Sequence, residues 1–397
     1  MKHIILFVLL IQLGHTSTFN LKQVLDKSNN NSTLTQALEQ ERLLLEARNL
    51  ADTSMDPMEL FGSAANANPL VGKDEFEYSV GLSKQFSWGN TQEEEQRINR
   101  LSNEAYFLEE DKKILNFKNG LKSLYHNHCL DNKYYKVSKQ NYQAFVKLYK
   151  KKQKAYKYQE ISKAELMQLE IEKNRLYAQL QEIEMTQVIS KQKLFVLGRI
   201  NNANTTTLSC KDIYPIRDNI KLDGDRFQLS KEAHTKRLKS TQAALERYSS
   251  SLDSISLSAQ YDKEIDMDRY GIGISIPLNF TSSRSEQERV AAMHKSSALG
   301  FQHEQIMLEK RSRLLELQSY LNSKALMLKT LKNNHRNYKK QLLPLIKKSY
   351  DLGETSVIEY LLNRQKSYQL RQEIYATKKA YYNTLFKLYA LSETKDK

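Results

Sequence analysis

The segments EFEYSVGLSKQF at residues 75–86 and RYGIGISIPL at 269–278 decide the fold of this chain. In both, apolar side chains alternate with small or polar ones, which is typical of a β-strand with two different faces. The core of the first segment, YSVGLS at 78–83, matches YGIGIS at 270–275, an offset of 192 residues. The chain therefore contains at least two related strands, far apart in the sequence.

Two further segments alternate in the same way. The stretch SISLSAQYD at 254–262 does so clearly, and the stretch 57–64 does so more weakly. We predict four strands per chain, at about 57–64, 75–86, 254–262 and 269–279.

The offset continues through the helical regions, where it becomes 194 residues. Lys154-Ala155-Tyr156 matches Lys348-Ser349-Tyr350, and Lys193-Leu194 matches Lys387-Leu388. Such self-similarity indicates one supersecondary unit present twice. We therefore predict a first helix–strand–helix repeat at 19–205 and a second at 206–397, integrated into one subunit.

The remaining sequence predicts very long helices. With only 12 Gly and 5 Pro, both clustered, long segments contain no helix breaker. We expect helices at 21–49, 90–154, 162–197, 282–348 and 356–391. A sixty-residue helix spans about 90 Å and needs neighbours along its length. A seam of leucines at spacings of three and four, from Leu166 to Leu197, favours coiled-coil-like packing.

The first 18 residues predict export. Lys2 and His3 precede an apolar run from Ile4 to Leu13, as in a secretory signal peptide cleaved near residues 17–19. No later stretch approaches the roughly 20 apolar residues of a transmembrane helix. We therefore expect an exported chain without a helical anchor.

Composition narrows the classes of partner. Lys and Arg total 61 against 46 Asp and Glu, giving a formal charge of +15. In a cytosolic protein this excess would indicate nucleic acid, but export argues against that partner, and lysines on solvated helix faces account for the charge.

Strands with one apolar face fit either a soluble sandwich or a membrane barrel. Because the strands are separated by helices too long to cover a compact sheet, we favour the barrel. Four strands cannot close alone, so the chain must oligomerise. Two chains would give eight strands and three would give twelve, and only twelve leave an aqueous lumen.

The segment YDLGETSVIEYL at 350–361 resembles the helix tip of the outer-membrane efflux protein family typified by TolC. The resemblance covers essentially the whole mature chain, and SIPL at 275–278 is similar to the family's second strand-to-helix junction. It implies a mainly α-helical fold with a small β part, in which a homotrimer forms a twelve-stranded barrel and a periplasmic α-helical barrel.

The resemblance also implies partners: a periplasmic adaptor (membrane fusion protein), an inner-membrane transporter of the RND or ABC type, and outer-membrane lipid. The helix interruptions would form the adaptor-facing tips. These tip residues are Tyr158, Gln159, Ser162, Leu352, Gly353, Glu354 and Ser356. Glu359 matches an acidic residue of the family's periplasmic constriction, whereas the next acidic position is Leu362 here and the first tip has Gln159 in place of glycine.

Two motifs, DPMEL at 56–60 and QFSWG at 85–89, look like elements of the heavy-metal-efflux branch with CusC- and CzcC-like proteins. The implied function is passive exit of metal ions or small toxic compounds. Type I protein secretion or multidrug export is the alternative, because the inner-membrane pump chooses the cargo. A soluble exported coiled-coil scaffold is a third alternative, which leaves the strands unexplained.

The sequence contains no evident catalytic or metal centre. It has no nucleophile elbow, no phosphate-binding glycine loop and no His-Glu-x-x-His, so we expect neither enzyme activity nor a cofactor. His126, His128 and Cys129 group together, but i,i+2 spacing directs helical side chains to opposite sides. We interpret them as an incidental surface cluster.

Two further positions carry predictions. Trp88 follows the second strand and is expected in an aromatic girdle at the membrane interface. The sequence permits a disulfide between Cys129 and Cys210, but a helical and a loop residue seldom meet its geometric demands, so we do not expect one.

Overall fold

The structure is a computed structural model that describes residues 18–67, 75–201, 206–220, 222, 225–248, 252–277 and 283–393. The predicted signal peptide lies outside these residues except for Thr18. The chain divides into two compact units. Unit 1 comprises residues 1–36, 113–226 and 311–397, and unit 2 comprises residues 37–112 and 227–310.

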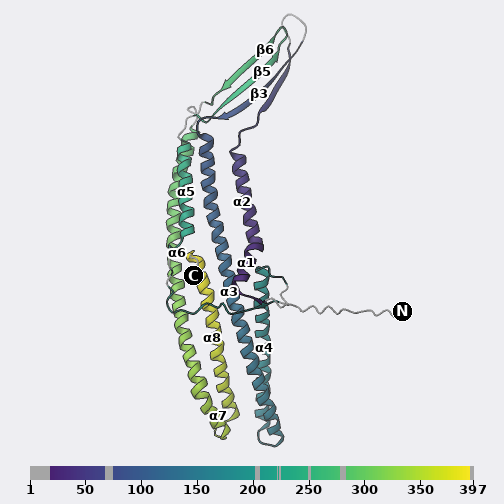
Figure 1. Ribbon diagram of the computed structural model, residues 1–397, viewed down its shortest axis with the longest axis vertical. Helices are drawn as coiled ribbons and strands as arrows, with labels where there is room; N and C mark the ends of the chain where they lie inside the picture. Colours follow the sequence, from purple (N-terminus) through teal and green to yellow (C-terminus); the bar gives the residue numbers. More distant parts are fainter. Residues whose placement is uncertain are drawn as a thin grey trace, which may run out of the picture. The chain divides into compact units, whose positions relative to one another are not determined.

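Unit 2 contains a four-stranded sheet (Figure 1). Its strands are β2 (Glu59–Ala67), β3 (Glu75–Ser87), β5 (Ser254–Lys263) and β6 (Asp268–Ser275). They lie in the order β2-β3-β5-β6, and each neighbouring pair is antiparallel. Two hairpins distant in sequence thus join through β3 and β5.

The strand register aligns the apolar positions of all four strands. Leu82 on β3 lies opposite Leu60 on β2 and Ala259 on β5, and Ala259 lies opposite Ile272 on β6. The next row, on the other face, is Phe61, Gly81, Gln260 and Gly271. Since side chains alternate between faces, one face is apolar and the other is mainly small or polar.

The helices of unit 2 are held by ion pairs. They are α2 (Thr33–Asp52, from residue 37), α5 (Gln228–Arg247) and the first parts of α3 (Thr91–Lys157) and α6 (Arg284–Asn337). Arg42 of α2 contacts Glu110 of α3 at 2.8 Å, and the Glu110 side chain is fully buried. Arg247 at the end of α5 binds Asp253 at 2.7 Å, just before β5.

Unit 1 is built from helices that run side by side (Figure 1). Besides the later parts of α3 and α6, its elements are α1 (Leu21–Asn31), α4 (Lys163–Leu197), the π-helix η2 (Tyr338–Leu342), α7 (Leu343–Asp351) and α8 (Val357–Ser392). Two short parallel strands, β1 (Thr18–Phe19) and β4 (Thr207–Leu208), pair with each other. No described helix has the length and apolar character needed to span a membrane.

Two predicted helices are interrupted. The helix expected at 21–49 is two helices, because Ser32 has an extended backbone and its side chain caps α2 by accepting from the Thr35 N–H at 3.0 Å. The helix expected at 282–348 contains the π-helix just before Pro344, which has no N–H to continue the α-helical pattern. The sequence analysis predicted no break at either site, although Pro344 lies within the second predicted helix.

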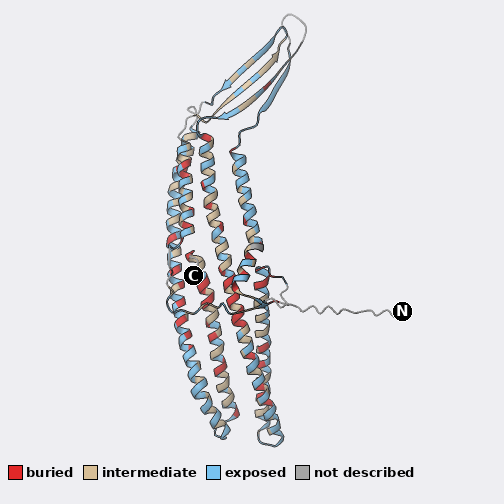
Figure 2. Cartoon of the chain, in the orientation of Figure 1, coloured by how far each residue is buried: buried red, intermediate tan, exposed pale blue. Residues whose placement is uncertain are grey.

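Burial follows the helix-facing sides in unit 1 (Figure 2). One core cluster includes Leu21, Leu121, Tyr125, Leu194 and Phe195, where α1, α3 and α4 meet. The predicted leucine seam contributes directly, since Leu169, Leu176, Leu180 and Leu194 are buried, whereas Leu197 is exposed.

Candidate functional site

The apolar face of the sheet is exposed. Tyr270 and Ile272 of β6 are 80% and 89% exposed, and Phe76 of β3 is 66% exposed. Val80 and Leu82 on the same face are also exposed. A contiguous apolar face of this kind requires lipid or another surface to cover it.

The two outer strands of the sheet are β2 and β6. Within the described part of the chain, no other strand pairs with their outer edges. Unpaired backbone groups at a sheet edge favour pairing with a further strand. The sheet therefore has the properties of a segment of a larger assembly.

Trp88 lies where β3 joins α3 and is about half exposed, at 52%. Its backbone N–H donates to the Asp253 backbone carbonyl at 2.9 Å, and its backbone carbonyl accepts from the Thr91 hydroxyl at 2.6 Å. The backbone thus fixes the strand-to-helix junction and leaves the indole ring at the surface.

The two predicted tips have the same turn. At the end of α3, the Gln159 and Glu160 N–H groups donate to the carbonyls of Tyr156 and Ala155, both at 3.0 Å. At the end of α7, Gly353 and Glu354 repeat these bonds 194 residues later, at 3.1 and 2.9 Å, to Tyr350 and Ser349. This pair of bonds is the Schellman arrangement, which needs a left-handed residue. Gln159 has φ 61° and Gly353 has φ 78°.

A serine begins the helix that leaves each tip. Ser162 caps α4 and Ser356 caps α8, each accepting from the N–H three residues on at 3.1 Å. Tyr158 and Leu352 are 78% and 64% exposed at the turns themselves. The predicted tip residues therefore form two surface turns held by backbone bonds.

Glu165 and Glu359 occupy matching positions but differ in their contacts. The Glu165 carboxylate completes a capping box by accepting from the Ser162 N–H at 3.0 Å. The exposed Glu359 carboxylate makes no hydrogen bond or ion pair with any described residue; only its backbone groups bond. Of the two, only Glu359 is available to ions or partners.

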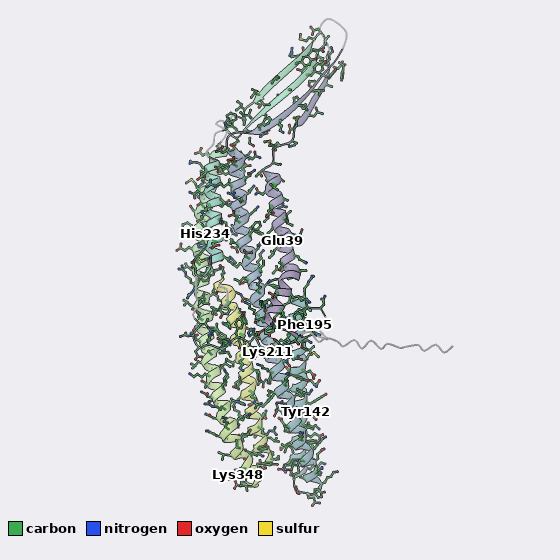
Figure 3. All side chains as sticks on the ribbon, viewed as in Figure 1. Glu39, Tyr142, Phe195, Lys211, His234 and Lys348 are labelled. Atoms are coloured by element: carbon green, nitrogen blue, oxygen red, sulfur yellow. A yellow bond between two sulfur atoms is a disulfide. The ribbon has the colours of Figure 1, made fainter. Side chains whose placement is uncertain are left out.

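An apolar cluster packs the two hairpin ends together. Phe145 and Tyr149 of α3, Leu169 of α4 and Val357 of α8 are buried in it, with Tyr350 of α7 at its margin. Lysines lie over its aromatic rings: the Lys152 ammonium is 4.9 Å from the Tyr350 ring centroid, a cation–π distance. Lys348, near Tyr350, is labelled at this end of the unit in Figure 3. The turns thus lie on a shared support.

The first tip is strongly basic. The last turns of α3 have lysines at positions 147, 150, 151, 152, 154 and 157. Lysine at a helix C-terminus interacts favourably with the helix dipole, but this effect is confined to the last turn, which contains Lys154 and Lys157. The remaining charge makes this end of the hairpin attractive to acidic surfaces.

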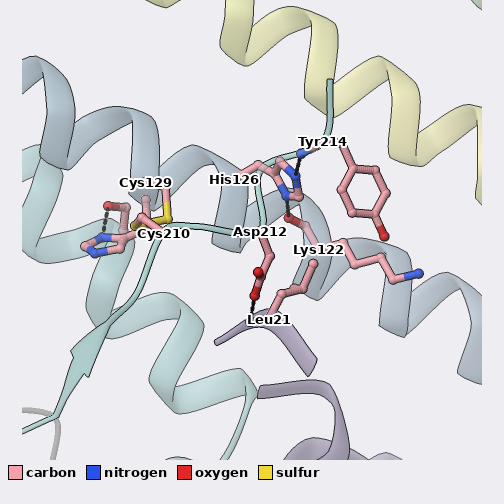
Figure 4. Close-up of a disulfide and its surroundings, with 9 residues drawn as sticks. Leu21, Lys122, His126, Cys129, Cys210, Asp212 and Tyr214 are labelled. Atoms are coloured by element: carbon pink, nitrogen blue, oxygen red, sulfur yellow. Dashed lines mark hydrogen bonds between the residues drawn. A yellow bond between two sulfur atoms is a disulfide. The ribbon is translucent and has the colours of Figure 1, made fainter. Parts of the chain in front are cut away.

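The cysteine prediction was wrong: Cys129 and Cys210 form a disulfide, with Cα atoms 5.4 Å apart. Cys210 belongs to an extended segment, residues 206–220, which we call the strap. The strap crosses α3 and brings the loop cysteine to the helix (Figure 4). Two cysteines in an exported chain were the available signal, but the strap's path cannot be inferred from local sequence.

Several hydrogen bonds fasten the strap. The Tyr214 N–H donates to His126 Nε2 at 3.0 Å, and the Leu21 N–H donates to the Asp212 carboxylate at 3.2 Å (Figure 4). The Tyr382 hydroxyl of α8 donates to the Tyr214 carbonyl at 2.6 Å. The strap therefore connects the start of α1 with the middle of α3 and with α8.

The histidines are buried, so their interpretation as a surface cluster was also wrong. His126 is fully buried against Tyr214, Tyr382 and Phe386. His128 is 3% exposed and lies 3.1 Å from the Ser190 hydroxyl of α4. Burial lowers the pKa of His128 to about 4, so it is neutral at pH 7. The described residues contain no group of three or more His, Cys, Asp or Glu able to hold a metal ion.

Comparison with known proteins identifies the class of fold. No protein-family model matches the sequence, and no curated protein matches it. Solved structures do: the CmeC outer membrane channel of Campylobacter jejuni has a TM-score of 0.74 at 15% identity, over 95% of this chain and 87% of CmeC. The chain thus has the fold of an outer-membrane channel subunit, which confirms the predicted TolC-like fold class.

Two further structures show the same similarity. CusC has a TM-score of 0.75 at 15% identity, over 94% of this chain and 92% of CusC. VceC of Vibrio cholerae has a TM-score of 0.72 at 13% identity, over 94% and 96%. Because CmeC and CusC are equally similar, the comparisons do not favour the heavy-metal branch.

Proposed function

We propose that this chain is the outer-membrane exit duct of a tripartite efflux system. The observation that carries the proposal is the sheet, which has one exposed apolar face and one small or polar face, and whose two outer edges pair with no other strand of the described residues. In a membrane the apolar face would contact lipid, and the other face would line water. The similarity in fold to outer-membrane channels supports the same interpretation.

The proposed assembly is a homotrimer. The edge of β6 in one copy would pair antiparallel with β2 of the next, so that three copies of four strands close a twelve-stranded barrel. Trp88 would lie in the aromatic girdle at the periplasmic boundary. Localisation in the outer membrane, with the helices in the periplasm, follows from this arrangement.

The two tips are the proposed adaptor-facing surface. Their exposed turns lie beside six lysines on α3, so we expect the periplasmic adaptor to present acidic residues here. A ring of three Glu359 carboxylates, one from each copy, is the proposed periplasmic constriction. Because Leu362 stands where a second acidic residue would be expected, the constriction would have one ring of carboxylates instead of two.

The duct would act passively and would catalyse no reaction. Metal ions or small toxic compounds, delivered by an RND or ABC transporter, are the proposed cargo, and the motifs at 56–60 and 85–89 favour metal ions. Protein secretion or multidrug export would use the same duct with another pump. No nucleic acid takes part.

The first experiment is extraction from the outer-membrane fraction, followed by mass determination and single-channel recording in a planar bilayer. A detergent-soluble trimer that conducts is the expected result. A water-soluble species that does not conduct would overturn the proposal and favour the coiled-coil scaffold.

The constriction is tested by Glu359→Gln, with Glu165→Gln as the matched control. Loss of the free carboxylate should lower cation selectivity, because a ring of like charges concentrates counter-ions. The control removes a carboxylate engaged in capping, and should leave selectivity unchanged. Equal effects of the two variants would refute the assignment of Glu359.

A further inference from the structure

Phe61 of β2 is the exception on one face of the sheet. We call this face the polar face; it lies opposite the apolar face that contains Leu60, Leu82, Ala259 and Ile272. Among the described side chains of the polar face, every strand residue is serine, glycine, alanine, glutamine or a charged residue except Phe61. A large aromatic side chain at this one position needs an explanation.

The Phe61 ring crosses to the neighbouring strand and covers Gly81. A Cβ added at Gly81 would overlap the Cζ and Cε2 atoms of the Phe61 ring, which shows that the ring lies on the polar face. Gly81 is buried, but Phe61 itself is 38% exposed. The ring therefore lies along the sheet and leaves part of its surface open.

The second hairpin contains the same pair of positions without an aromatic residue. Gly273 matches Gly81 at the offset of 192, and its partner on β5 is Ser258. The Ser258 Oγ would lie 2.6 Å from a Cβ at Gly273, and it donates to the Gly273 carbonyl at 3.4 Å. An aromatic ring over a glycine can stabilise a strand pair, but here a serine is enough. The fold alone therefore does not require Phe61.

A free carboxylate lies beside the ring. Glu59 precedes Phe61 by two residues on β2, so both side chains are on the polar face, about 7 Å apart along the strand. Glu59 is exposed, and its carboxylate makes no hydrogen bond or ion pair with any described residue. An aromatic ring and an unpaired negative charge are thus adjacent on one surface.

The rest of the polar face offers no competing positive charge. Arg269 is the only lysine or arginine among the described strand residues of this face, and its guanidinium pairs with the Glu264 carboxylate at 3.1 Å. By strand alternation, Lys84 and Lys263 lie on the apolar face. Although the whole chain is basic, this surface attracts cations.

We propose that Phe61 and Glu59 form a recognition site for organic cations inside the barrel. The inference rests on the proposed duct, in which the polar face lines water. The π face of Phe61 would contact the cation and its apolar substituents, and the Glu59 carboxylate would balance the charge. Three copies would place three such sites at one level of the lumen. Among small toxic compounds, the duct would therefore retain cationic ones longest.

The duplication also indicates what lies beside the ring in the assembly. Within the chain, β3 and β5 pair with Gly81 opposite Gln260. If β6 of one copy and β2 of the next pair in the equivalent register, Ser275 lies opposite Phe61. A serine is too small to cover the ring. The site therefore stays open to the lumen in the proposed trimer.

The test is recording of the K⁺ current through the full chain in a planar bilayer, with benzyltrimethylammonium added on the side of the strand hairpins. The probe should reduce the current in a voltage-dependent way. Phe61→Leu keeps an apolar side chain but removes the π face, and should raise the half-blocking concentration about threefold or more. Glu59→Gln should raise it as well. Phe76→Leu is the matched control, because Phe76 is exposed on the apolar face, and should change nothing.

Ser258→Phe tests the site by addition. It places a second ring over Gly273 and should lower the half-blocking concentration, so the proposal stays testable even if variants at residue 61 fail to insert. Absence of block, equal block of Phe61→Leu and the unmodified chain, equal block by benzenesulfonate, or no gain in Ser258→Phe would each overturn the site while the current still supports the duct. Absence of any current through the unmodified chain would overturn the duct itself, and this inference with it.

Discussion

The two helical hairpins of unit 1 have the same turn at their tips but differ along their lengths. The first hairpin, α3 and α4, contains an uninterrupted α3 of 67 residues, and Cys129 ties it to the strap. The second, formed by α6, η2, α7 and α8, contains no cysteine and is interrupted at residues 338–342 by a π-helix. The first is reinforced covalently, whereas the second contains a weak point.

The difference indicates how a duplicated unit can acquire one rigid hairpin and one deformable hairpin. The offset between the repeats grows from 192 residues at the strands to 194 at the tips, so the second arm contains two additional residues. A π-turn holds one more residue than an α-turn and can absorb part of this excess. We therefore expect the second hairpin to open locally at a lower free energy than the first.

The largest expected effect is loss of the disulfide. The double substitution Cys129→Ala with Cys210→Ala should lower the free energy of unfolding by about 4 kcal/mol, because the bridge closes a loop between residues 81 apart. Denaturant titration measures this loss, and hydrogen exchange should rise most in α3 around residue 126. Dithiothreitol should destabilise the unmodified chain equally and leave the variant unchanged. Equal exchange in both hairpins of the variant would contradict the comparison.

The next effect concerns Pro344. It lacks the backbone N–H that would donate to the Lys340 carbonyl in an α-helix. The matching residue of the first hairpin is Lys150, within the continuous α3. Lys150→Pro should therefore cost about 3 kcal/mol, whereas Pro344→Ala should stabilise the second hairpin by about 1 kcal/mol. Hydrogen exchange of the amides at residues 338–342 measures the stabilisation expected for Pro344→Ala. Persistence of the π-helix in Pro344→Ala would assign it to the extra residue instead of the proline.

A smaller effect depends on pH and on His128 of the first hairpin, which is 3% exposed. Burial lowers the pKa of His128 to about 4, below its value of about 6.5 in an unfolded chain. The unfolded state therefore binds more protons between these values, so stability falls as pH decreases through this window. From pH 7 to pH 5 the loss is about 2 kcal/mol.

Substitution His128→Leu should remove this part of the pH dependence and leave stability at pH 7 nearly unchanged or higher. His294→Leu is the control, because His294 is an exposed histidine on α6. Urea titrations at pH 7 and pH 5 measure the difference. An unchanged pH dependence in His128→Leu would show that the ring does not resist protonation.

The sequence predicted the fold through features that depend on near neighbours. Period-two alternation indicated strands at 75–86 and 254–262, and the structure has β3 and β5 at Glu75–Ser87 and Ser254–Lys263. Scarce glycine and proline indicated the long helices, whose presence with a small β part confirms the fold class. The tip turns are local as well, since each needs only a left-handed residue followed by a capping serine.

The strap and the buried histidines could not be predicted, because they depend on contacts between distant segments. Spacing at i,i+2 did direct His126 and His128 to different sides of α3, but two different neighbours cover those sides. The strap and α8 cover His126, and α4 covers His128. A pattern within one helix cannot reveal whether one face or two will be covered.

The smallest effect tests whether the two tips are equivalent in backbone but not in sequence. Gln159 and Gly353 both have left-handed backbones, with φ of 61° and 78°, although only glycine adopts this region without steric cost. Gln159→Gly should therefore stabilise the first tip by about 0.5–1 kcal/mol, and Gly353→Gln should destabilise the second by a similar amount. Thermal unfolding of the two single variants and the double swap measures both values.

The double swap should be close to neutral, since it exchanges one unfavourable residue between identical turns. If Gln159→Gly instead destabilises the chain, the glutamine side chain itself must stabilise the first tip, and the two tips would differ in more than the identity of one residue.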